Sequence, residues 1–295
     1  NIQNIEIIIV DSGSTDATRA IASRYPVKLL SIDPKEFSFG RALNLGCQAA
    51  RGEFIVITSA HVYPLYEDWL EELLRPFSDP EVALTYGKQR GNEITKYSEH
   101  QVFATWFPDS GERKYQDHPF CNNANAAIRR TLWEKYPYNE ELTGLEDLDW
   151  ANRLITLGYR VVYVPEAEIV HVHEETLNHI YNRYRREAIA LNRIFPEGKF
   201  TLWDFVRLLT GNIFTDCYHA ASEGVLIKNF WSVAAFRLMQ FWGTYRGFTQ
   251  RGLTSIQLRQ TFYYPRDYSR VIKDDDHDGK RRNRIDYADE NQAQK

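Results

Sequence analysis

The stretch Ile5-Glu6-Ile7-Ile8-Ile9-Val10, followed directly by Asp11-Ser12-Gly13-Ser14-Thr15-Asp16, decides the fold. The β-branched run predicts a strand buried on both faces of a parallel sheet. The polar turn after it carries several candidate helix caps and leads into a helical segment that we expect to end near residue 25. Together they predict the strand, turn and helix that begin a layered α/β domain.

Strand and helix patterns continue to alternate up to residue 86, with predicted strands at 27–32, 54–58 and 82–86. A helix is expected to end near residue 50 and another to span 68–77. This alternation predicts an α/β layered domain whose ligands bind beyond the carboxyl ends of the strands. Residues 87–120 are polar, aromatic and irregular, so we expect a lid or an acceptor-binding loop there.

The second half of the chain predicts a strand at 123–129, a short helix at 131–136, and a helix at 146–157 that Gly158 ends. Strands are expected at 159–164 and 169–173, and the apolar spacing of 176–194 predicts an amphipathic helix. The chain then reads as helical to about residue 252. We expect three parts: an α/β domain at 1–175, a helical extension at 176–272, and a disordered polar tail at 273–295.

Composition indicates a soluble globular protein, since 43% of the 295 residues are hydrophobic and the formal net charge is -4. The absence of a basic excess argues against a nucleic-acid binder. Three cysteines without a Cys-x-x-Cys spacing favour a reducing, cytoplasmic setting over a disulfide or zinc scaffold. The sequence contains no uncharged apolar run long enough to predict a membrane-spanning helix. The chain starts at Asn1, without a methionine, as a fragment of a longer protein would.

Three carboxylates stand among apolar residues in Gly144-Leu145-Glu146-Asp147-Leu148-Asp149-Trp150. Carboxylates in such surroundings are costly to bury unless they are paired, neutralised or given a chemical task. One interpretation is a catalytic centre. The other is the acidic first turn of a helix, capped by Thr143 or Gly144 and favoured by the helix dipole.

Four segments together resemble the inverting family 2 glycosyltransferases of the GT-A fold, over about residues 5–173. They are Ile8 to Thr18, Phe39 to Val56, Asn122 to Arg130, and the carboxylate run that ends at Trp150. The resemblance implies a GT-A-like, Rossmann-type layered domain. It also implies transfer of a sugar from a nucleoside diphosphate donor to an acceptor hydroxyl.

The first two segments imply the donor-binding residues. In the family, the aspartate equivalent to Asp11 contacts the nucleotide base, with Gly13 and Ser14 in the turn beside it. Gly13 lets the backbone turn tightly, and a carboxylate at a strand end accepts base or ribose hydrogen bonds. Arg41 is expected at the nucleotide or diphosphate. The alternatives are a structural turn and an exposed helix arginine.

The last two segments imply the catalytic and acceptor-binding residues. Asp147 would take the proton of the acceptor hydroxyl as that oxygen attacks the anomeric carbon, and Glu146 would orient the substrate. Asn123, Asn125 and Trp150 are expected to contact the acceptor. Asparagines near a strand end also often serve only the backbone.

The family's Asp-x-Asp, which holds a divalent metal, is replaced here by Ser59-Ala60-His61. We expect Ser59 and His61 at the donor diphosphate. His171 and His173 share one face of a predicted strand, and His173 is expected to bind the metal together with His61. The alternatives are a structural loop histidine at His61 and ordinary hydrogen bonding by the two strand histidines. The metal would be manganese or magnesium, and imidazole ligands favour manganese.

Basic residues that follow this strand are either groups that close over the diphosphate or part of a solvated helix face. They are Arg183, Arg185 and Arg186.

The predicted function is therefore transfer of a sugar to a saccharide or lipid-linked acceptor in surface polysaccharide assembly, with deoxythymidine diphosphate rhamnose as a candidate donor. A lipid-linked acceptor would bring the helical extension to the cytoplasmic face of the membrane. One alternative is an inactive binding or regulatory protein, suggested by Ser59-Ala60-His61. The other is a sugar nucleotidyltransferase, although the chain lacks a glycine-rich, basic phosphate loop near its start.

Overall fold

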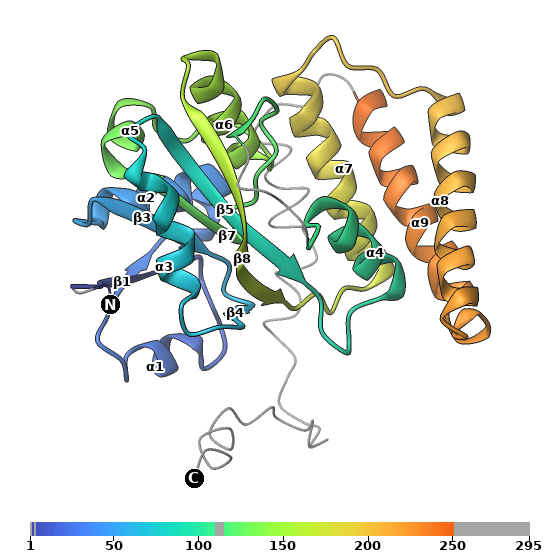
Figure 1. Ribbon diagram of the computed structural model, residues 1–295, viewed down its shortest axis with the longest axis horizontal. Helices are drawn as coiled ribbons and strands as arrows, with labels where there is room; N and C mark the ends of the chain where they lie inside the picture. Colours follow the sequence, from blue (N-terminus) through green and yellow to red (C-terminus); the bar gives the residue numbers. More distant parts are fainter. Residues whose placement is uncertain (1, 3, 110–114, 251–295) are drawn as a thin grey trace.

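The computed structural model describes residues 2, 4–109 and 115–250. A central sheet carries helices on both faces, and a group of long helices stands beside it (Figure 1). The predicted α/β layered architecture with C-terminal helices is confirmed. The expected polar tail, and the part of the helical extension after residue 250, lie outside the described residues.

The first two strands form a small sheet of their own. β1 (Ile7–Asp11) and β2 (Val27–Ser31) pair in parallel, with α1 (Thr18–Ala22) between them. The prediction that the first strand is buried on both faces is wrong, because Ile7 is 53% exposed. Among the described residues β1 has only β2 as a strand neighbour, and α2 (Phe39–Ala49) packs against it.

Within the described residues, the main sheet has six strands that run in mixed directions. Its order is β3-β7-β5-β8-β4, and β6 also pairs with β8. β5 and β8 run parallel, whereas β7 is antiparallel to both of its neighbours. The strands are β3 (Phe54–Thr58), β4 (Val62–Pro64), β5 (Val82–Arg90), β6 (Tyr115–Gln116), β7 (Asn125–Arg129) and β8 (Arg160–His171).

β8 is one strand where the sequence predicted two. It runs through Pro165, although proline cannot donate a hydrogen bond to a ladder. Its pairing with β5 shifts register between Gly87 and Gln89, so the strands pair on both sides of the irregularity. β4 and β6, of three and two residues, were not predicted because such short strands have no readable alternation.

The core lies on both faces of the main sheet. Val161 and Tyr163 of β8 belong to one apolar cluster, and Val162 and Val164 belong to the other, as the alternation of a strand requires. α2, α4, α5 and α6 cover the first face, and α3 with η2 covers the second. These covering elements are α3 (Trp69–Leu74), η2 (Arg75–Ser78), α4 (Tyr97–Trp106), α5 (Arg130–Lys135) and α6 (Glu146–Thr156). The short turn before α2 is η1 (Pro34–Glu36).

The prediction of an irregular segment at 87–120 is wrong in part, because this segment contains α4 (Tyr97–Trp106). Ser98 and Glu99 are buried on the inner side of α4. Polar residues at these inner positions removed the apolar periodicity from which a helix is usually predicted.

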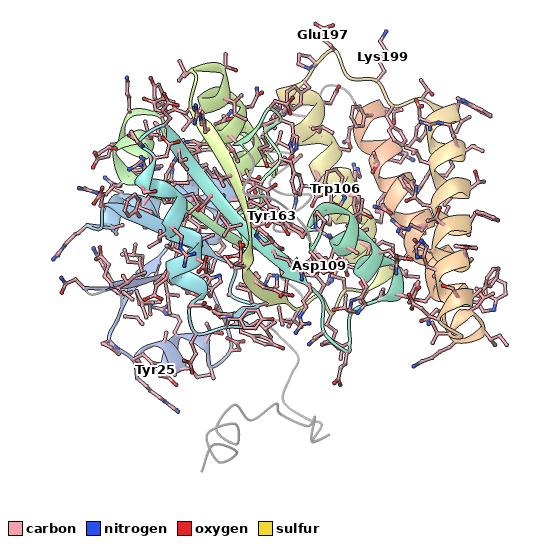
Figure 2. The ribbon with its side chains drawn as sticks, viewed as in Figure 1. Tyr25, Trp106, Asp109, Tyr163, Glu197 and Lys199 are labelled. Carbon is pink, nitrogen blue, oxygen red and sulfur yellow. The ribbon has the colours of Figure 1, made fainter. Side chains whose placement is uncertain are left out.

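Two side-chain contacts hold the chain after α4 against the sheet, and Figure 2 labels Asp109 and Tyr163, which take part in them. The hydroxyl of Tyr163 donates to the carbonyl oxygen of Pro108 at 3.0 Å, and Lys88 forms an ion pair with Asp109. These contacts hold the segment beyond α4 against β5 and β8.

Up to residue 250, where the described part of the chain ends, three long helices follow the sheet: α7 (Leu177–Ile194), α8 (Leu202–Ser222) and α9 (Leu226–Thr249). The predicted helix at 176–194 is confirmed as α7, with Thr176 as its N-cap. α9 packs against both α7 and α8. The guanidinium of Arg237 on α9 donates to both carboxylate oxygens of buried Asp216 on α8, at 2.7 and 2.8 Å. None of the helices in the described ranges is long and apolar enough to cross a membrane.

Candidate active site

The turn after β1 is held by Asp11, as expected of a residue at a strand end. Asp11 is 5% exposed, and its Oδ1 accepts the backbone N–H of Ser14 at 3.1 Å. A hydrogen bond from the side chain of Ser14, with a smaller contribution from its backbone N–H, outweighs the opposing effect of burial and lowers the pKa of Asp11. Ser14 itself is exposed. Asp11 is therefore an ionised acceptor at the end of β1.

Gly13 has a φ of 101°, which side-chain-bearing residues rarely adopt. A Cβ at Gly13 would also lie 2.6 Å from Cγ of Pro34.

We expect Gly13→Ala to lower the free energy of unfolding by about 1–3 kcal/mol, the usual cost of a strained backbone conformation. Urea denaturation measures this value. Gly211→Ala is the matched control, because Gly211 lies inside α8 with open space around its Cα. It should be neutral or stabilising. Equal effects of the two variants would contradict the proposed strain at Gly13.

Arg41 faces two carboxylates. Its Nη2 lies 2.8 Å from Oε2 of Glu36, and its Nη1 lies 3.8 Å from Oε2 of Glu140. A diphosphate contact would therefore require Arg41 to exchange partners, and its donor role stays a prediction. Ser59 is half-buried, one residue after β3 and two residues before His61.

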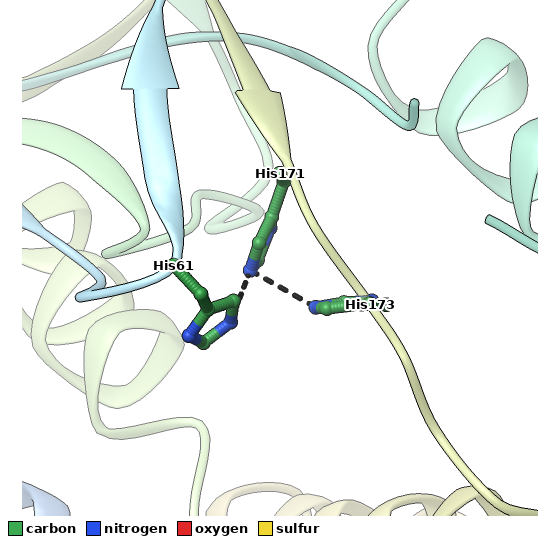
Figure 3. A group of neighbouring side chains, drawn as sticks. All are labelled: His61, His171 and His173. Carbon is green, nitrogen blue, oxygen red and sulfur yellow. Dashed lines mark hydrogen bonds between the residues drawn. The ribbon is translucent and has the colours of Figure 1, made fainter. Parts of the chain in front are cut away.

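His61, His171 and His173 meet at one point and are called here the three-histidine centre (Figure 3). Pairing of β4 with β8 sets Val62 opposite His171, which brings His61 to the end of β8. Nε2 of His171 lies 2.8 Å from Nε2 of His61 and 2.9 Å from Nε2 of His173. One ring nitrogen from each histidine thus lies within 4.8 Å of the others.

Two of these rings are oriented by buried polar groups on other elements. Nδ1 of His171 lies 2.8 Å from Oε1 of Gln89 on β5. Nδ1 of His173 lies 2.7 Å from Oε1 of Glu99 on α4. A carboxylate only accepts, so Nδ1 of His173 carries a proton. Hydrogen bonds of this kind on the far nitrogen are typical of histidines that bind metal.

The three-histidine centre fits a divalent metal by its donor set. Burial lowers the pKa of His171 to about 2, and the neighbouring His173 and His61 act in the same direction. The ring is therefore neutral at physiological pH. Neutral imidazole is the form that ligates metals. His61, on the exposed side, leaves the centre open to a ligand.

Glu146 and Asp147 begin α6, so the pair lies at a helix start as expected, but the expected cap at Thr143 or Gly144 is wrong because the N-cap is Leu145, which forms no side-chain cap bond. Leu145, directly before them, has a φ of 56°, a conformation that costs free energy in a leucine and is common at functional sites. Oδ2 of Asp147 accepts the backbone N–H of Asn123 at 2.9 Å, and Oδ1 accepts that of Leu148 at 2.8 Å. Asp147 thus joins α6 to the chain before β7.

Both carboxyl groups hold protons more tightly than usual. Burial, followed by the charge of Asp147, raises the pKa of Glu146 to about 8. Burial also raises the pKa of Asp147, and its backbone hydrogen bonds oppose this effect. Oε2 of Glu146 is buried and has no hydrogen-bond partner in the described part of the chain. Two basic carboxylates with spare acceptor capacity can receive a proton.

The predicted acceptor residues divide into two groups. The side-chain amide of Asn123, next to Asp147, has no hydrogen-bond partner within the described ranges. Asn125 is fully buried, accepts from the indole N–H of Trp69 and donates to the backbone. Trp150 is also fully buried in the core. The structure gives Asn125 and Trp150 structural roles and leaves neither an exposed surface for an acceptor.

α7 connects the two parts of the site. Arg183 forms ion pairs of 2.6 Å with Glu99, which orients His173, and with Glu175. Arg186 lies one turn further, and its charge opposes the rise in the pKa of Glu146. Residues three apart are neighbours on a helix surface. The three-histidine centre and the Glu146–Asp147 pair therefore face the same side of α7.

Sequence reasoning missed Gln89 and Glu99, whose signal in the sequence is only that of polar residues in a strand and an unpredicted helix. It also left open the roles of the α7 arginines. Arg183 is part of the site's support, whereas Arg185 donates to the side chain of Gln250, away from both clusters.

Comparison with known proteins finds a family match for the first part of the chain. Residues 1–136 match the model of glycosyl transferase family 2. The O-antigen chain rhamnosyltransferase of Salmonella anatum is 31% identical over 192 residues, which are 62% of this chain and 61% of that protein. The O-antigen chain rhamnosyltransferase of Salmonella typhimurium is 28% identical over 190 residues, which are 61% and 60% of the two chains. The chain thus spans about three fifths of these relatives.

Among solved structures, a mannosyltransferase from Pyrobaculum calidifontis in complex with GDP-Man and Mn2+ has a TM-score of 0.51 and 20% identity. The match covers 87% of this chain and 76% of that one. This likeness shows the GT-A fold that was predicted.

Proposed function

We propose that the protein transfers a sugar from a nucleoside diphosphate donor to a hydroxyl of a saccharide or lipid-linked acceptor, with inversion, because residues 1–136 match the model of glycosyl transferase family 2. The site lies in the α/β part, residues 1–175, and the helices after it form an extension. The observation that carries the proposal is the buried Glu146–Asp147 pair at the start of α6, on the same side of α7 as the three-histidine centre.

The proposed reaction is a single displacement. Asp147 takes the proton of the acceptor hydroxyl while that oxygen forms a bond to the anomeric carbon. The bond from this carbon to the diphosphate oxygen breaks on the opposite face, and the nucleoside diphosphate leaves with the electron pair. Backbone bonds from Asn123 and Leu148 fix the carboxylate of Asp147, and each of its oxygens keeps a lone pair for the proton.

His61, His171 and His173 would hold a divalent metal, in place of the missing Asp-x-Asp. The bound metal would offset the negative charge on the leaving diphosphate. Asp11 and the turn at Gly13 support a nucleotide at the end of β1, because ligands of α/β sheets bind beyond the carboxyl ends of strands.

The two rhamnosyltransferase relatives support deoxythymidine diphosphate rhamnose as the donor and an O-antigen or similar surface polysaccharide as the product. A panel of nucleotide sugars, tested for binding by calorimetry and for turnover with saccharide and lipid-linked acceptors, tests this choice. We expect the rhamnose donor to bind and turn over. Turnover of another nucleotide sugar with no reaction of the rhamnose donor would overturn it.

We expect turnover to depend on pH through the carboxylate pair. Burial raises the pKa of Asp147 and Glu146, so the base form appears only at higher pH, and kcat should rise along an acid limb with a midpoint above 3.8. Glu146→Gln should leave this limb nearly in place, because the raised pKa of Glu146 keeps it neutral while Asp147 loses its proton. A limb that moves strongly in this variant would contradict the assignment of the base to Asp147. Initial rates from pH 4 to 9 provide the measurement.

A peripheral membrane contact through the helical extension is part of this proposal. Trp203 and Phe214 on α8, and Ile227 and Trp231 on α9, are large apolar side chains exposed to solvent. Aromatic residues beside basic Lys228 are typical of surfaces that lie in a lipid interface.

Sedimentation with anionic vesicles tests this contact. We expect the protein to sediment with the vesicles and Trp231→Glu to reduce this binding. Tyr25→Glu should not, because Tyr25 is equally an exposed aromatic residue but lies far from α8 and α9 (Figure 2). Equal loss in both variants would contradict the assigned surface.

A further inference from the structure

We propose that the three-histidine centre binds a transition-metal ion that accepts imidazole nitrogen, and excludes Mg²⁺, with His171 as a ligand beside His61 and His173. Glu99 is a positioning residue that orients His173. This inference deepens the proposed function and rests on it for the role of the metal, but the binding of the metal can be measured without donor or turnover.

The ring nitrogens converge in a way that side-chain packing does not require. His61 and His173 both direct Nε2 at Nε2 of His171, at 2.8 and 2.9 Å (Figure 3). Every such contact between two imidazole nitrogens needs a proton on one of them. A cation placed among the three lone pairs satisfies all of them at once, with no proton on any Nε2.

Buried hydrogen-bond partners keep the Nε2 atoms of His171 and His173 directed into the three-histidine centre. Gln89 is 1% exposed and Glu99 is 2% exposed, and each binds the Nδ1 of one histidine. The same oxygen of Glu99 also accepts from the guanidinium of Arg183 at 2.6 Å, so Glu99 faces two donors. Glu99 therefore acts as an acceptor that keeps the proton on Nδ1 of His173, which leaves Nε2 free for a metal.

A second group of possible metal ligands shares His173 with the three-histidine centre, but an arginine already neutralises its carboxylates. Glu99 and Glu175 lie close to His173 and could in principle hold a cation with it. The guanidinium of Arg183 is 2.6 Å from an oxygen of each of these carboxylates. Arg183 thus supplies the positive charge at that position, and the metal is left to the three imidazoles.

The chemistry of the donor set selects the metal. Magnesium requires oxygen ligands, whereas manganese, cobalt, nickel and zinc accept imidazole. Three neutral nitrogens cancel none of the ion's charge, so a bound ion keeps its full attraction for diphosphate oxygens. Three protein ligands also leave coordination positions open, as in catalytic metal sites.

The test is direct titration of the metal-free protein with Mg²⁺, Mn²⁺, Co²⁺ and Ni²⁺ by calorimetry, without donor. We expect one site, affinity that rises from Mn²⁺ to Co²⁺ and Ni²⁺, and no binding of Mg²⁺. The visible spectrum of bound Co²⁺ reports its coordination by nitrogen. Tighter binding of Mg²⁺ than of Mn²⁺, or no binding of any of these ions, would overturn the proposal.

Variants identify the ligands. His171→Ala should abolish binding of Co²⁺, whereas His179→Ala should leave it unchanged, because His179 is an exposed histidine at the start of α7. Circular dichroism and thermal unfolding show whether His171→Ala folds. His61→Ala, on the exposed side of the centre, is the second variant and should also abolish binding. Unchanged Co²⁺ binding in folded His61→Ala would overturn the assignment.

Glu99 is tested by two substitutions. Glu99→Ala should weaken Co²⁺ binding by about 10- to 100-fold, as is usual when a partner of a metal-bound histidine is removed. Glu99→Gln should restore most of this loss, because an amide oxygen still accepts from Nδ1 of His173, as that of Gln89 does for His171. Equal losses in both variants would contradict the positioning role. Metal binding without turnover would leave this inference intact and would contradict only the proposed function.

Discussion

Asp147→Asn is expected to lower kcat by about 10²- to 10⁴-fold, the usual contribution of a general base. Asparagine has nearly the same shape as aspartate but cannot take the acceptor's proton. The amide can still accept one of the two backbone bonds that Asp147 accepts from Asn123 and Leu148. Its neutrality also removes repulsion with Glu146. We therefore expect a folded protein that binds donor with nearly the same affinity and turns it over slowly.

The measurement combines initial rates with calorimetric titration of the donor. Asp149→Asn is the matched control, because Asp149 lies in the same helical turn but forms a 3.0 Å ion pair with Arg153. It should keep kcat within a few-fold of the starting protein, since a partly exposed ion pair contributes about 1 kcal/mol or less. Unchanged kcat in Asp147→Asn would refute the assignment of the base.

His171→Ala is expected to have the second large effect. A Lewis-acidic metal contributes several kcal/mol to stabilising charge in a transition state, and each 1.36 kcal/mol corresponds to tenfold in rate. Loss of the central ligand should therefore lower kcat/KM for the donor by about 10²- to 10⁴-fold. His171 contacts both other histidines of the centre, so no single remaining ring can replace it.

Rates are measured with added Mn²⁺, because excess metal would rescue a variant that merely binds it more weakly. The His179→Ala variant should react at the original rate. Full activity of folded His171→Ala, or activity that strong chelators leave unchanged in the starting protein, would contradict a metal role in turnover.

Local patterns in the sequence were sufficient for much of the fold. β2, β3 and α7 lie where β-branched runs or apolar spacing placed them. The burial of β1 could not be predicted, because the same β-branched run serves a central strand and a strand with one neighbour. α4 was missed since its inner side carries Glu99, whose partner His173 lies 74 positions further along the chain.

As with the fold, part of the site could be predicted from neighbouring residues in the sequence, and part depends on contacts between residues far apart in the chain. His171 and His173 are two apart on an extended segment, so their meeting was predictable from strand geometry. That His61 joins them depends on the pairing of β4 with β8, which no local pattern reveals. Asn125 looked like a substrate-binding residue, but its amide is used by Trp69 and by backbone groups of neighbouring strands. Only the packed sheet supplies that information.

The central claim is inverting sugar transfer, and the most direct test is the product itself. The protein is incubated with deoxythymidine diphosphate rhamnose, Mn²⁺ and a lipid-linked saccharide acceptor, and nuclear magnetic resonance determines the anomeric configuration of the new linkage. We predict a glycosylated acceptor with inverted configuration and an equal amount of released nucleoside diphosphate. A separate incubation with a sugar phosphate and a nucleoside triphosphate tests the nucleotidyltransferase alternative, which predicts release of pyrophosphate. In the main experiment, donor binding without release would support an inactive binding protein, and a product with retained configuration would contradict the single displacement.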